Sequence, residues 1–242
     1  MPDPDQDNPT LPISETFVSV QGEGKLTGVP SWFCRVAGCN LRCGWCDTPY
    51  ASWDPSGDRR SVSDLITEAR GSGVSHAVLT GGEPMIFHEI VPLARGLRDA
   101  GVHVTIETAG TVWQDGLACD LISISPKLSN STPTGDPRDP TGAWAERHEE
   151  RRRRPGVVTS LLGAYPDRQL KFVVTSPADL PEIETLLGAY GGWSPDDVIL
   201  MPEGVSVPEP GDIAWVVETC QERGWRYGHR LHIQLFGNTR GT

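Results

Sequence analysis

The chain has 242 residues and a formal net charge of −11 at pH 7. This acidic balance argues against nucleic-acid and anionic-membrane partners, because such surfaces need clustered Lys and Arg. The length suits one α/β domain over residues 1–242, since no low-complexity linker divides it. Residues 1–10 contain no basic and apolar leader and no later run approaches membrane-spanning length, so we expect a cytoplasmic protein.

Two strands open the chain. Residues 14–20 alternate in polarity and end in Gln21-Gly22-Glu23-Gly24, where glycines allow the backbone to approach a ligand closely. Residues 32–37 form an apolar strand, whose alternation places Trp32, Cys34 and Val36 on one face and Phe33, Arg35 and Ala37 on the other.

Three cysteines follow at C-x3-C-x2-C spacing: Cys39, Cys43 and Cys46. Thiolates this close together hold soft metal centres. A [4Fe-4S] cluster held by three of them leaves one iron open to the amine and carboxylate of S-adenosylmethionine. An electron from the reduced cluster would then cleave the sulfonium bond to a 5′-deoxyadenosyl radical, so the cofactor would carry the difficult chemistry.

A zinc site is the alternative, because Cys34 lies five residues upstream and could complete a four-thiolate set. The strand alternation instead predicts that Cys34 is a small buried hydrophobe. A non-catalytic zinc module therefore remains the second reading of these cysteines.

A strand-then-helix rhythm occupies the rest of the chain. Asp47 and Thr48 stand beside the cysteine loop, with oxygens that suit Mg²⁺. Residues 128–156 interrupt the rhythm and predict an exposed insertion with one short helix, its Arg151 to Arg154 run being a solvated helix end. We expect strands at 76–80, 102–107, 121–125, 169–175, 198–201 and 230–236, and helices at 63–70, 90–100, 212–223 and from a capping box at Ser176 to near Gly188.

Counted from residue 32, six strands could lie parallel, with polar residues at most of their carboxyl ends, where ligands gather in parallel barrels. The predicted fold is therefore an α/β open partial parallel barrel of about six strands. A doubly wound sheet is the alternative. The strand-end residues are Thr80, Glu83, Glu107, Thr108, Ser125, Lys127 and Glu203.

The cysteine spacing resembles the signature of the radical S-adenosylmethionine (SAM) superfamily. Within it, the chain resembles the 7-carboxy-7-deazaguanine synthase family over most of its length. The matching segments, in family order, are 21–24, Arg35, 39–48, 81–84, 107–111, 125–127 and the region of His232.

The resemblance implies a carbon-nitrogen lyase of queuosine-type 7-deazapurine biosynthesis. Such an enzyme contracts the ring of 6-carboxy-5,6,7,8-tetrahydropterin to 7-carboxy-7-deazaguanine with loss of ammonia, and regenerates S-adenosylmethionine. It implies a [4Fe-4S] cluster, S-adenosylmethionine and Mg²⁺ as cofactors, and a flavodoxin or ferredoxin as electron donor. It also implies a homodimer.

The resemblance implies residue roles as well. Cys39, Cys43 and Cys46 would ligate the cluster, Thr48 would be the protein ligand to Mg²⁺, and Arg35 would act on the substrate. S-adenosylmethionine would contact Trp45, Asp47, Gly82, Glu83, Ser125, Pro126 and Lys127. The pterin would contact Val20, Gln21, Gly22, Glu23, Arg35, Thr80 and His232.

A rival function keeps the same cluster loop. An activase that makes a glycyl radical on a partner protein needs the loop and a Gly-Gly-Glu strand end, but has no evident need for Gln21, Glu23 and Arg35 as a pterin clamp. The tail 238–242 continues past the matched segment, so no role is assigned to Thr242.

Overall fold

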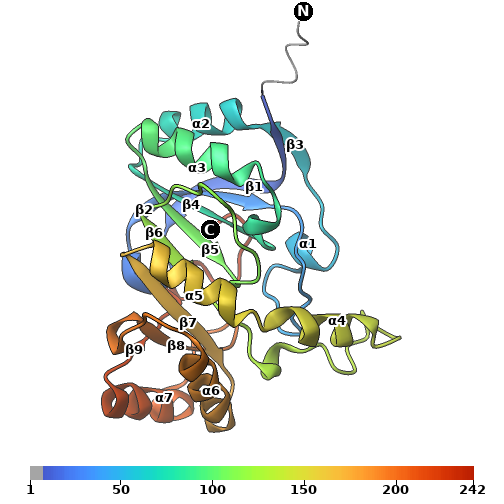
Figure 1. The fold of residues 1–242 in the computed structure, drawn as a ribbon, viewed down its shortest axis with the longest axis vertical. Helices are drawn as coiled ribbons and strands as arrows, with labels where there is room; N and C mark the ends of the chain where they lie inside the picture. Colours follow the sequence, from blue (N-terminus) through green and yellow to red (C-terminus); the bar gives the residue numbers. More distant parts are fainter. Residues whose placement is uncertain (1–7) are drawn as a thin grey trace, which may run out of the picture.

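The computed structural model describes residues 8–242, which build one nine-stranded sheet (Figure 1). At one edge, β3 (Asp58–Ser61) and β1 (Thr10–Val20) run antiparallel to their neighbours. The remaining strands are parallel. In sheet order they are β2 (Pro30–Val36), β4 (His76–Gly81), β5 (His103–Thr108), β6 (Leu121–Ile124), β7 (Arg168–Val174), β8 (Val198–Pro202) and β9 (Arg226–Tyr227).

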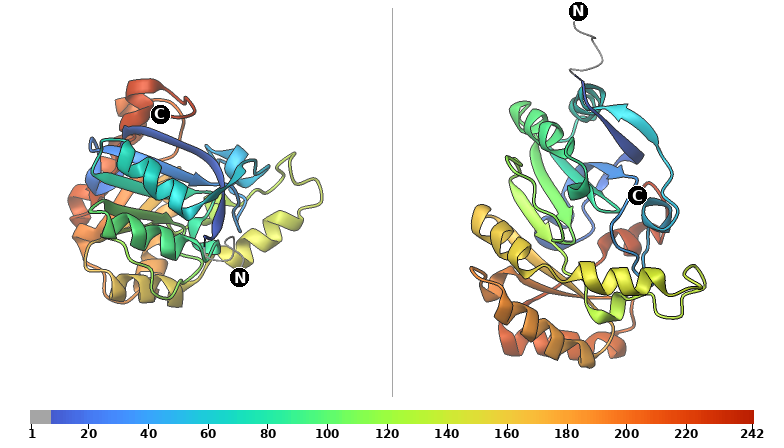
Figure 2. Two further views of the ribbon diagram at one scale, coloured as in Figure 1. Left: turned by 90° about the horizontal axis from the view of Figure 1, so that it is seen from above. Right: turned by 45° about the vertical axis from the view of Figure 1, so that its right-hand side comes forward.

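Five helices connect the parallel strands and cover the sheet from outside (Figure 2). They are α2 (Val62–Gly71), α3 (Ile90–Asp99), α5 (Pro155–Ala164), α6 (Leu180–Ala189) and α7 (Pro210–Arg223). The short helices α1 (Pro49–Ser52) and α8 (Leu231–Phe236) lie at the inner face, and α4 (Ala143–Arg152) packs beside residues 40–42. Within residues 8–242, none of these helices has the length and apolar character to cross a bilayer.

The two faces of the sheet differ in chemistry. Outward residues such as Cys34, Leu79 and Phe172 are fully buried in the hydrophobic core with the helices. Their neighbours Arg35, Thr80 and Lys171 line a cavity on the inner face instead. A doubly wound sheet buries apolar residues on both faces, so this polar inner face makes the sheet an open partial barrel, and the doubly wound alternative is wrong.

Most predicted elements lie within two residues of their observed bounds, including the capping box of Ser176 and Asp179. Four helices and strands were not predicted: α1, β3, α5 and the short β9.

The predicted strand at 230–236 is wrong. These residues form α8, which ends at Gly237 in the left-handed region. Among its alternate apolar residues Leu231, Ile233 and Leu235, only Ile233 is buried. The last strand of the sheet is β9, which pairs with β8 in the position that the predicted strand would have taken.

The expectation that residues 128–156 are exposed is also wrong for several of them. Leu128, Ser131, His148 and Arg152 are buried. Arg152 was expected at a solvated helix end, but its guanidinium is fully enclosed and forms ion pairs with Glu149 at 2.7 Å and Glu182 at 2.6 Å. Helix α4 is the one α-helix that lies wholly inside this segment.

Candidate active site

A cavity of about 470 Å³ lies inside the partial barrel, at the carboxyl ends of the parallel strands. The strands deliver side chains to it because residues of one parity on each strand point inward. Sixteen residues that the sequence assigned to the site line it: Val20, Gln21, Gly22, Glu23, Arg35, Cys39, Cys43, Trp45, Cys46, Asp47, Thr48, Thr80, Gly82, Ser125, Lys127 and His232.

The three loop cysteines share this wall. Leu41 donates its backbone N–H to Cys39 Sγ at 3.3 Å, and Cys46 Sγ lies 3.2 Å from Ser52 Oγ. Burial raises the pKa of the Cys39 thiol to about 12 and that of Cys43 well above its usual range. Thiols in such a site need a metal's positive charge to remain ionised.

These residues fit a cluster better than a single ion. Among residues 8–242, no group of three or more His, Cys, Asp or Glu side chains is arranged to hold one metal ion. Three thiols on one cavity wall, two of them with hydrogen-bond partners at sulfur, match the setting of an iron–sulfur cluster, whose sulfurs accept such bonds. Cys34 is buried in the core on the opposite face of β2 and is not on the cavity wall. A four-thiolate zinc site that includes Cys34 therefore has no support in this geometry.

Beside the cysteines, the cavity wall is formed by closely packed backbone segments. A Cβ on Gly82 would lie 2.1 Å from Gly38 O and 2.6 Å from Ala51 O, so only glycine allows these segments to meet. Gly38 in turn accepts a hydrogen bond from the Glu83 N–H at 2.9 Å. The Gly-Gly turn after β4 thus packs directly on the segments that flank the cysteine loop.

Glu83 and Pro126 are the two assigned residues that do not line the cavity. The Glu83 carboxylate is fully buried behind the wall, where it accepts hydrogen bonds from Thr108 Oγ1 at 2.8 Å and from the N–H groups of Ala109 and Met85 at 2.7 and 3.1 Å. Burial raises its pKa above the usual range. In this arrangement Glu83 anchors the turn after β5 instead of facing the cavity.

Ser125, Lys127 and Trp45 form one group on the cavity wall. Lys127 Nζ donates to Ser125 Oγ at 2.9 Å and to the Ser125 carbonyl at 3.0 Å. The same ammonium lies 5.7 Å from the centre of the Trp45 ring. A cation held over an aromatic face beside a hydroxyl suits a ligand with a carboxylate and a flat ring system.

Charged residues dominate the part of the cavity near β1. Lys171 pairs with Glu23, and Arg230 Nε lies 3.4 Å from Glu23 Oε1. Burial alone would raise the pKa of Glu23, but the positive charges of Lys171 and Arg230 hold it below its usual range. Glu23 is therefore an anion ready to accept hydrogen bonds from a ligand's N–H edge.

Gln21 and Thr80 meet on a second carboxylate of this part. Gln21 Nε2 donates to Glu107 Oε1 at 3.1 Å, and Thr80 Oγ1 donates to Glu107 Oε2 at 3.3 Å. Nearby, Gly22 approaches His232 so closely that a Cβ there would lie 2.0 Å from His232 Nδ1. The close contact brings α8 onto the Gln21–Glu23 turn, where Leu231 also donates its N–H to Gly22 O at 2.9 Å.

Arg35 is held by a carboxylate that the sequence did not single out. Its Nε donates to Glu15 Oε1 at 2.7 Å, and the same oxygen accepts from the Tyr50 hydroxyl at 2.8 Å. Glu15 Oε2 accepts from Arg240 Nε at 3.0 Å. Burial opposes ionisation of Glu15, but these hydrogen bonds lower its pKa. The contact through Nε leaves the two terminal nitrogens of Arg35 for a ligand.

Sequence reasoning missed several cavity residues. Glu107 was noted as a strand-end residue without a role, while Tyr50, Lys171, Arg230 and the tail 238–242, which includes Thr242, were not assigned at all, yet all of them line the cavity. Lys171 had a readable signal, because a lysine within the apolar strand residues 170–174 needs a partner on the inner face. For the tail, residue types and spacing gave no such signal, because its Arg240 forms an ion pair with Glu15, which is far away in sequence.

Known proteins resemble this chain in sequence and in fold. Residues 34–161 match the Radical SAM superfamily model, which defines the chain as a radical SAM protein. It is 51% identical to a 7-carboxy-7-deazaguanine synthase of Rhodopirellula baltica over 96% of this chain and 89% of that protein. A synthase of the same name from Halobacterium salinarum is 45% identical over 98% of this chain and 94% of that protein.

A solved structure has a similar fold. The crystal structure of QueE from Escherichia coli covers 92% of this chain and 95% of its own, with a TM-score of 0.68 and 25% sequence identity. The chain belongs to the 7-carboxy-7-deazaguanine synthase family.

Proposed function

We propose that this chain is a 7-carboxy-7-deazaguanine synthase that converts 6-carboxy-5,6,7,8-tetrahydropterin to 7-carboxy-7-deazaguanine and ammonia. Family membership makes it a radical SAM enzyme of the carbon-nitrogen lyase type. The observation that carries the proposal is one cavity that joins three thiols at one end to Arg35, Gln21, Glu23 and His232 at the other.

In this proposal, the cofactor end would hold the cluster and S-adenosylmethionine, which would supply the radical chemistry when bound. Cys39, Cys43 and Cys46 hold the cluster through their sulfurs. Lys127 and Ser125 bind the carboxylate end of S-adenosylmethionine, Trp45 and Asp47 contact it, and the Gly82 backbone allows close approach. Glu83 contributes indirectly, by holding the turn at Ala109.

At the substrate end, the terminal nitrogens of Arg35 bind the pterin carboxylate, while Glu15 keeps the guanidinium in place. Glu23 accepts hydrogen bonds from the pterin's N–H edge, and Gln21 and Thr80 are kept in orientation by Glu107. Val20, Gly22 and His232 close the pocket around the ring. Burial strengthens each of these contacts.

We assign the Mg²⁺ to Thr48. Its hydroxyl lines the cavity beside Cys46, at 3.8 Å from the Cys46 sulfur. Mg²⁺ takes few protein ligands and keeps water or substrate oxygens in its shell, so one hydroxyl facing the substrate space suffices. A one-electron donor of the flavodoxin or ferredoxin type and a homodimeric state complete the proposal.

The test is turnover under anaerobic conditions. Reduced, cluster-loaded protein is incubated with 6-carboxytetrahydropterin, S-adenosylmethionine and Mg²⁺, and the products are measured by absorbance and mass. The proposal expects 7-carboxy-7-deazaguanine and an equal amount of ammonia, with S-adenosylmethionine not consumed stoichiometrically. A full cluster without any deazapurine product would contradict it.

The glycyl-radical activase is the second candidate. Such an enzyme must admit a peptide segment, whereas Arg35, Glu23 and Lys171 fill this cavity with paired charges suited to a small polar heterocycle. The same turnover assay separates the two, because an activase leaves the pterin unchanged.

A further inference from the structure

Residues 128–156 make a set of hydrogen bonds to the cysteine loop. Two of them hold loop amides: Ser131 O accepts from Gly44 N at 2.9 Å, and His148 Nδ1 accepts from Arg42 N at 3.2 Å. Three more hold other groups, namely Arg138 Nη2 to Gly44 O at 2.8 Å, Arg151 Nη1 to Asn40 O at 3.1 Å and Trp45 Nε1 to Asn130 Oδ1 at 3.3 Å. The cysteine loop is therefore held from outside along most of its length.

His148 is the residue at the centre of this contact. Its Nδ1 accepts from Arg42, so its hydrogen resides on Nε2, which lies 2.9 Å from Ser131 Oγ. Ser131 Oγ donates its own hydrogen to Leu128 O at 2.5 Å. The ring is buried, and both its nitrogens are satisfied only in the neutral form. His148 thus links the amide between two cluster cysteines to the start of the segment.

Two aromatic contacts reinforce the same face. The Arg42 guanidinium lies 4.1 Å from the centre of the Trp144 ring on α4, and that of Arg138 lies 4.2 Å from the centre of the Trp53 ring. Trp53 in turn donates its ring N–H to Cys43 O at 2.9 Å. Cation–π contacts of this kind add to the hydrogen bonds that hold the loop.

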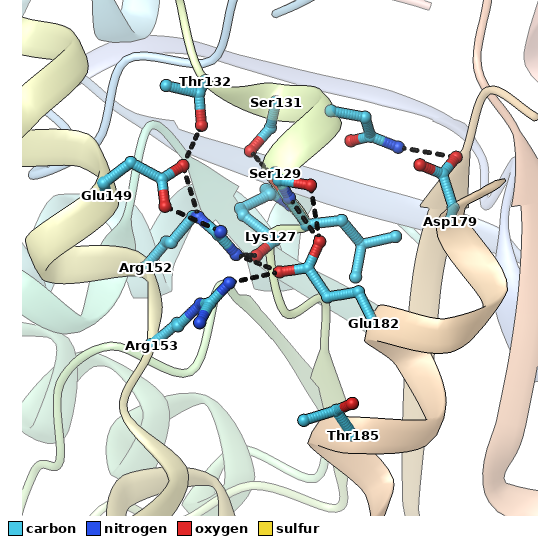
Figure 3. Close-up of polar contacts among 12 residues, drawn as sticks. Lys127, Ser129, Ser131, Thr132, Glu149, Arg152, Arg153, Asp179, Glu182 and Thr185 are labelled. Atoms are coloured by element: carbon cyan, nitrogen blue, oxygen red, sulfur yellow. Dashed lines mark hydrogen bonds and ion pairs between the residues drawn. The ribbon is translucent and has the colours of Figure 1, made fainter.

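The segment is anchored at its far end to the barrel (Figure 3). Arg152 Nη1 donates to Glu182 on α6 at 2.6 Å and to Lys127 O at 3.1 Å, while its other nitrogens bind Glu149. Glu182 also accepts from the Ser129 N–H at 2.8 Å. Arg152 follows His148 by four residues, so one face of α4 joins the cysteine loop to the carbonyl of Lys127.

We infer that residues 128–156 act as a brace that fixes the cysteine loop before the cluster binds, and that His148 is its positioning residue. The inference rests on the proposed ligand roles of Cys39, Cys43 and Cys46. The brace holds the Arg42 and Gly44 amides, and so keeps the loop in the conformation that directs its thiols into the cavity. It also ties that conformation to Lys127, which the proposed function assigns to the cofactor.

Three substitutions at one position separate this role from simple packing. His148→Asn retains an acceptor oxygen near the place of Nδ1 and can still bind the Arg42 N–H. His148→Gln reaches the place of Nε2 and retains the Ser131 contact alone, and His148→Leu retains neither. The matched control is His76→Leu, because His76 is also buried with Ser31 at 2.7 Å and Thr105 at 2.8 Å, but lies at the amino end of β4.

The measurement is amide hydrogen exchange of the metal-free protein, in a peptide that spans residues 40–46. We expect His148→Gln and His148→Leu to accelerate exchange there by about tenfold or more, and His148→Asn to stay near the parent chain. The control should leave this peptide unchanged. Equal exchange in all variants would overturn the brace, and so would acceleration by His148→Asn as large as that of His148→Leu.

A second readout uses the loaded protein without turnover. Release of iron to a chelator should be about tenfold faster in His148→Leu than in the parent chain and His76→Leu, with His148→Asn again near the parent chain. Failure of the ligand assignment is distinguishable, because Cys43→Ala would then retain its iron. If Cys43→Ala loses iron while every His148 variant releases it at the parental rate, the brace alone is wrong.

Discussion

The two ends of the cavity are built in different ways. At the cofactor end, thiols, hydroxyls and backbone groups come mainly from short consecutive stretches, and glycines such as Gly82 let the backbone close in. At the substrate end, charged side chains from distant elements neutralise one another, as with Glu23 and Lys171, 148 positions apart, or Glu15 and Arg240, 225 positions apart. Changes of volume should therefore damage the first end, and changes of charge the second.

The largest effect is expected for Arg35→Ala at the substrate end. Loss of the proposed contact between Arg35 and the pterin carboxylate should raise the activation free energy by about 2–5 kcal/mol. This lowers kcat/KM roughly thirtyfold to several-thousandfold, with iron content unchanged. Steady-state kinetics and iron analysis of the same preparation check this. Arg59→Ala, at an exposed arginine of β3, serves as the control. Loss of iron in Arg35→Ala would contradict the account, because it would show that this residue of the substrate end is also needed for cluster binding.

The next largest effect is expected for Lys171→Met. Removing this ammonium leaves the buried Glu23 with Arg230 alone, which should lower the free energy of unfolding by about 3 kcal/mol. Urea denaturation of the metal-free chain measures it. Adding Glu23→Gln should recover most of the stability but none of the turnover. A double variant no more stable than Lys171→Met would show that the pair is not coupled.

Gly82→Ala should weaken cofactor binding only because the added methyl group has no space. The new Cβ would meet Gly38 O at 2.1 Å, so backbone must shift, and we expect the KM for S-adenosylmethionine to rise by about tenfold while the pterin KM changes little. Gly71→Ala, where a Cβ meets nothing within 4 Å, is the control. An equal rise in the KM values for S-adenosylmethionine and the pterin would show that the two ends of the cavity do not bind their ligands independently.

A last expected effect is a pH dependence of stability. Burial lowers the pKa of His76 and His148 from 6.5 to about 4, so the unfolded chain binds protons first as the pH falls. The free energy of unfolding should therefore decrease between pH 6.5 and 4. Glu15, Glu149 and Glu182 have lowered pKa values, so their contribution is lost at lower pH.

Urea denaturation of the metal-free chain at several pH values measures this dependence. His148→Asn, which removes one of the two histidines, should show a shallower decrease. A flat curve between pH 6.5 and 4 in the parent chain would contradict the burial argument.

The same contrast explains what the sequence could predict. Strand periodicity placed Cys34 in the core and Arg35 in the cavity, because alternation on β2 is a local property. The cofactor end was readable because its residues are close in sequence. Arg230 and Glu15 were missed because their role depends on partners far along the chain. Residues 128–156 were wrongly predicted to be exposed because they contain few apolar residues. The segment is partly buried instead, through polar contacts of His148 and Arg152, which composition does not reveal.

Anaerobic iron analysis of cysteine variants tests the central claim most directly, which is that three thiols of one loop, without Cys34, hold the cluster. Cys34→Ala should retain about four irons per chain and an electron paramagnetic resonance signal of the reduced cluster that changes when S-adenosylmethionine is added. Cys39→Ala, Cys43→Ala and Cys46→Ala should each lose the cluster. Loss of iron from Cys34→Ala, with no response to S-adenosylmethionine in the parent chain, would mean that four thiolates saturate the metal centre and would contradict the account.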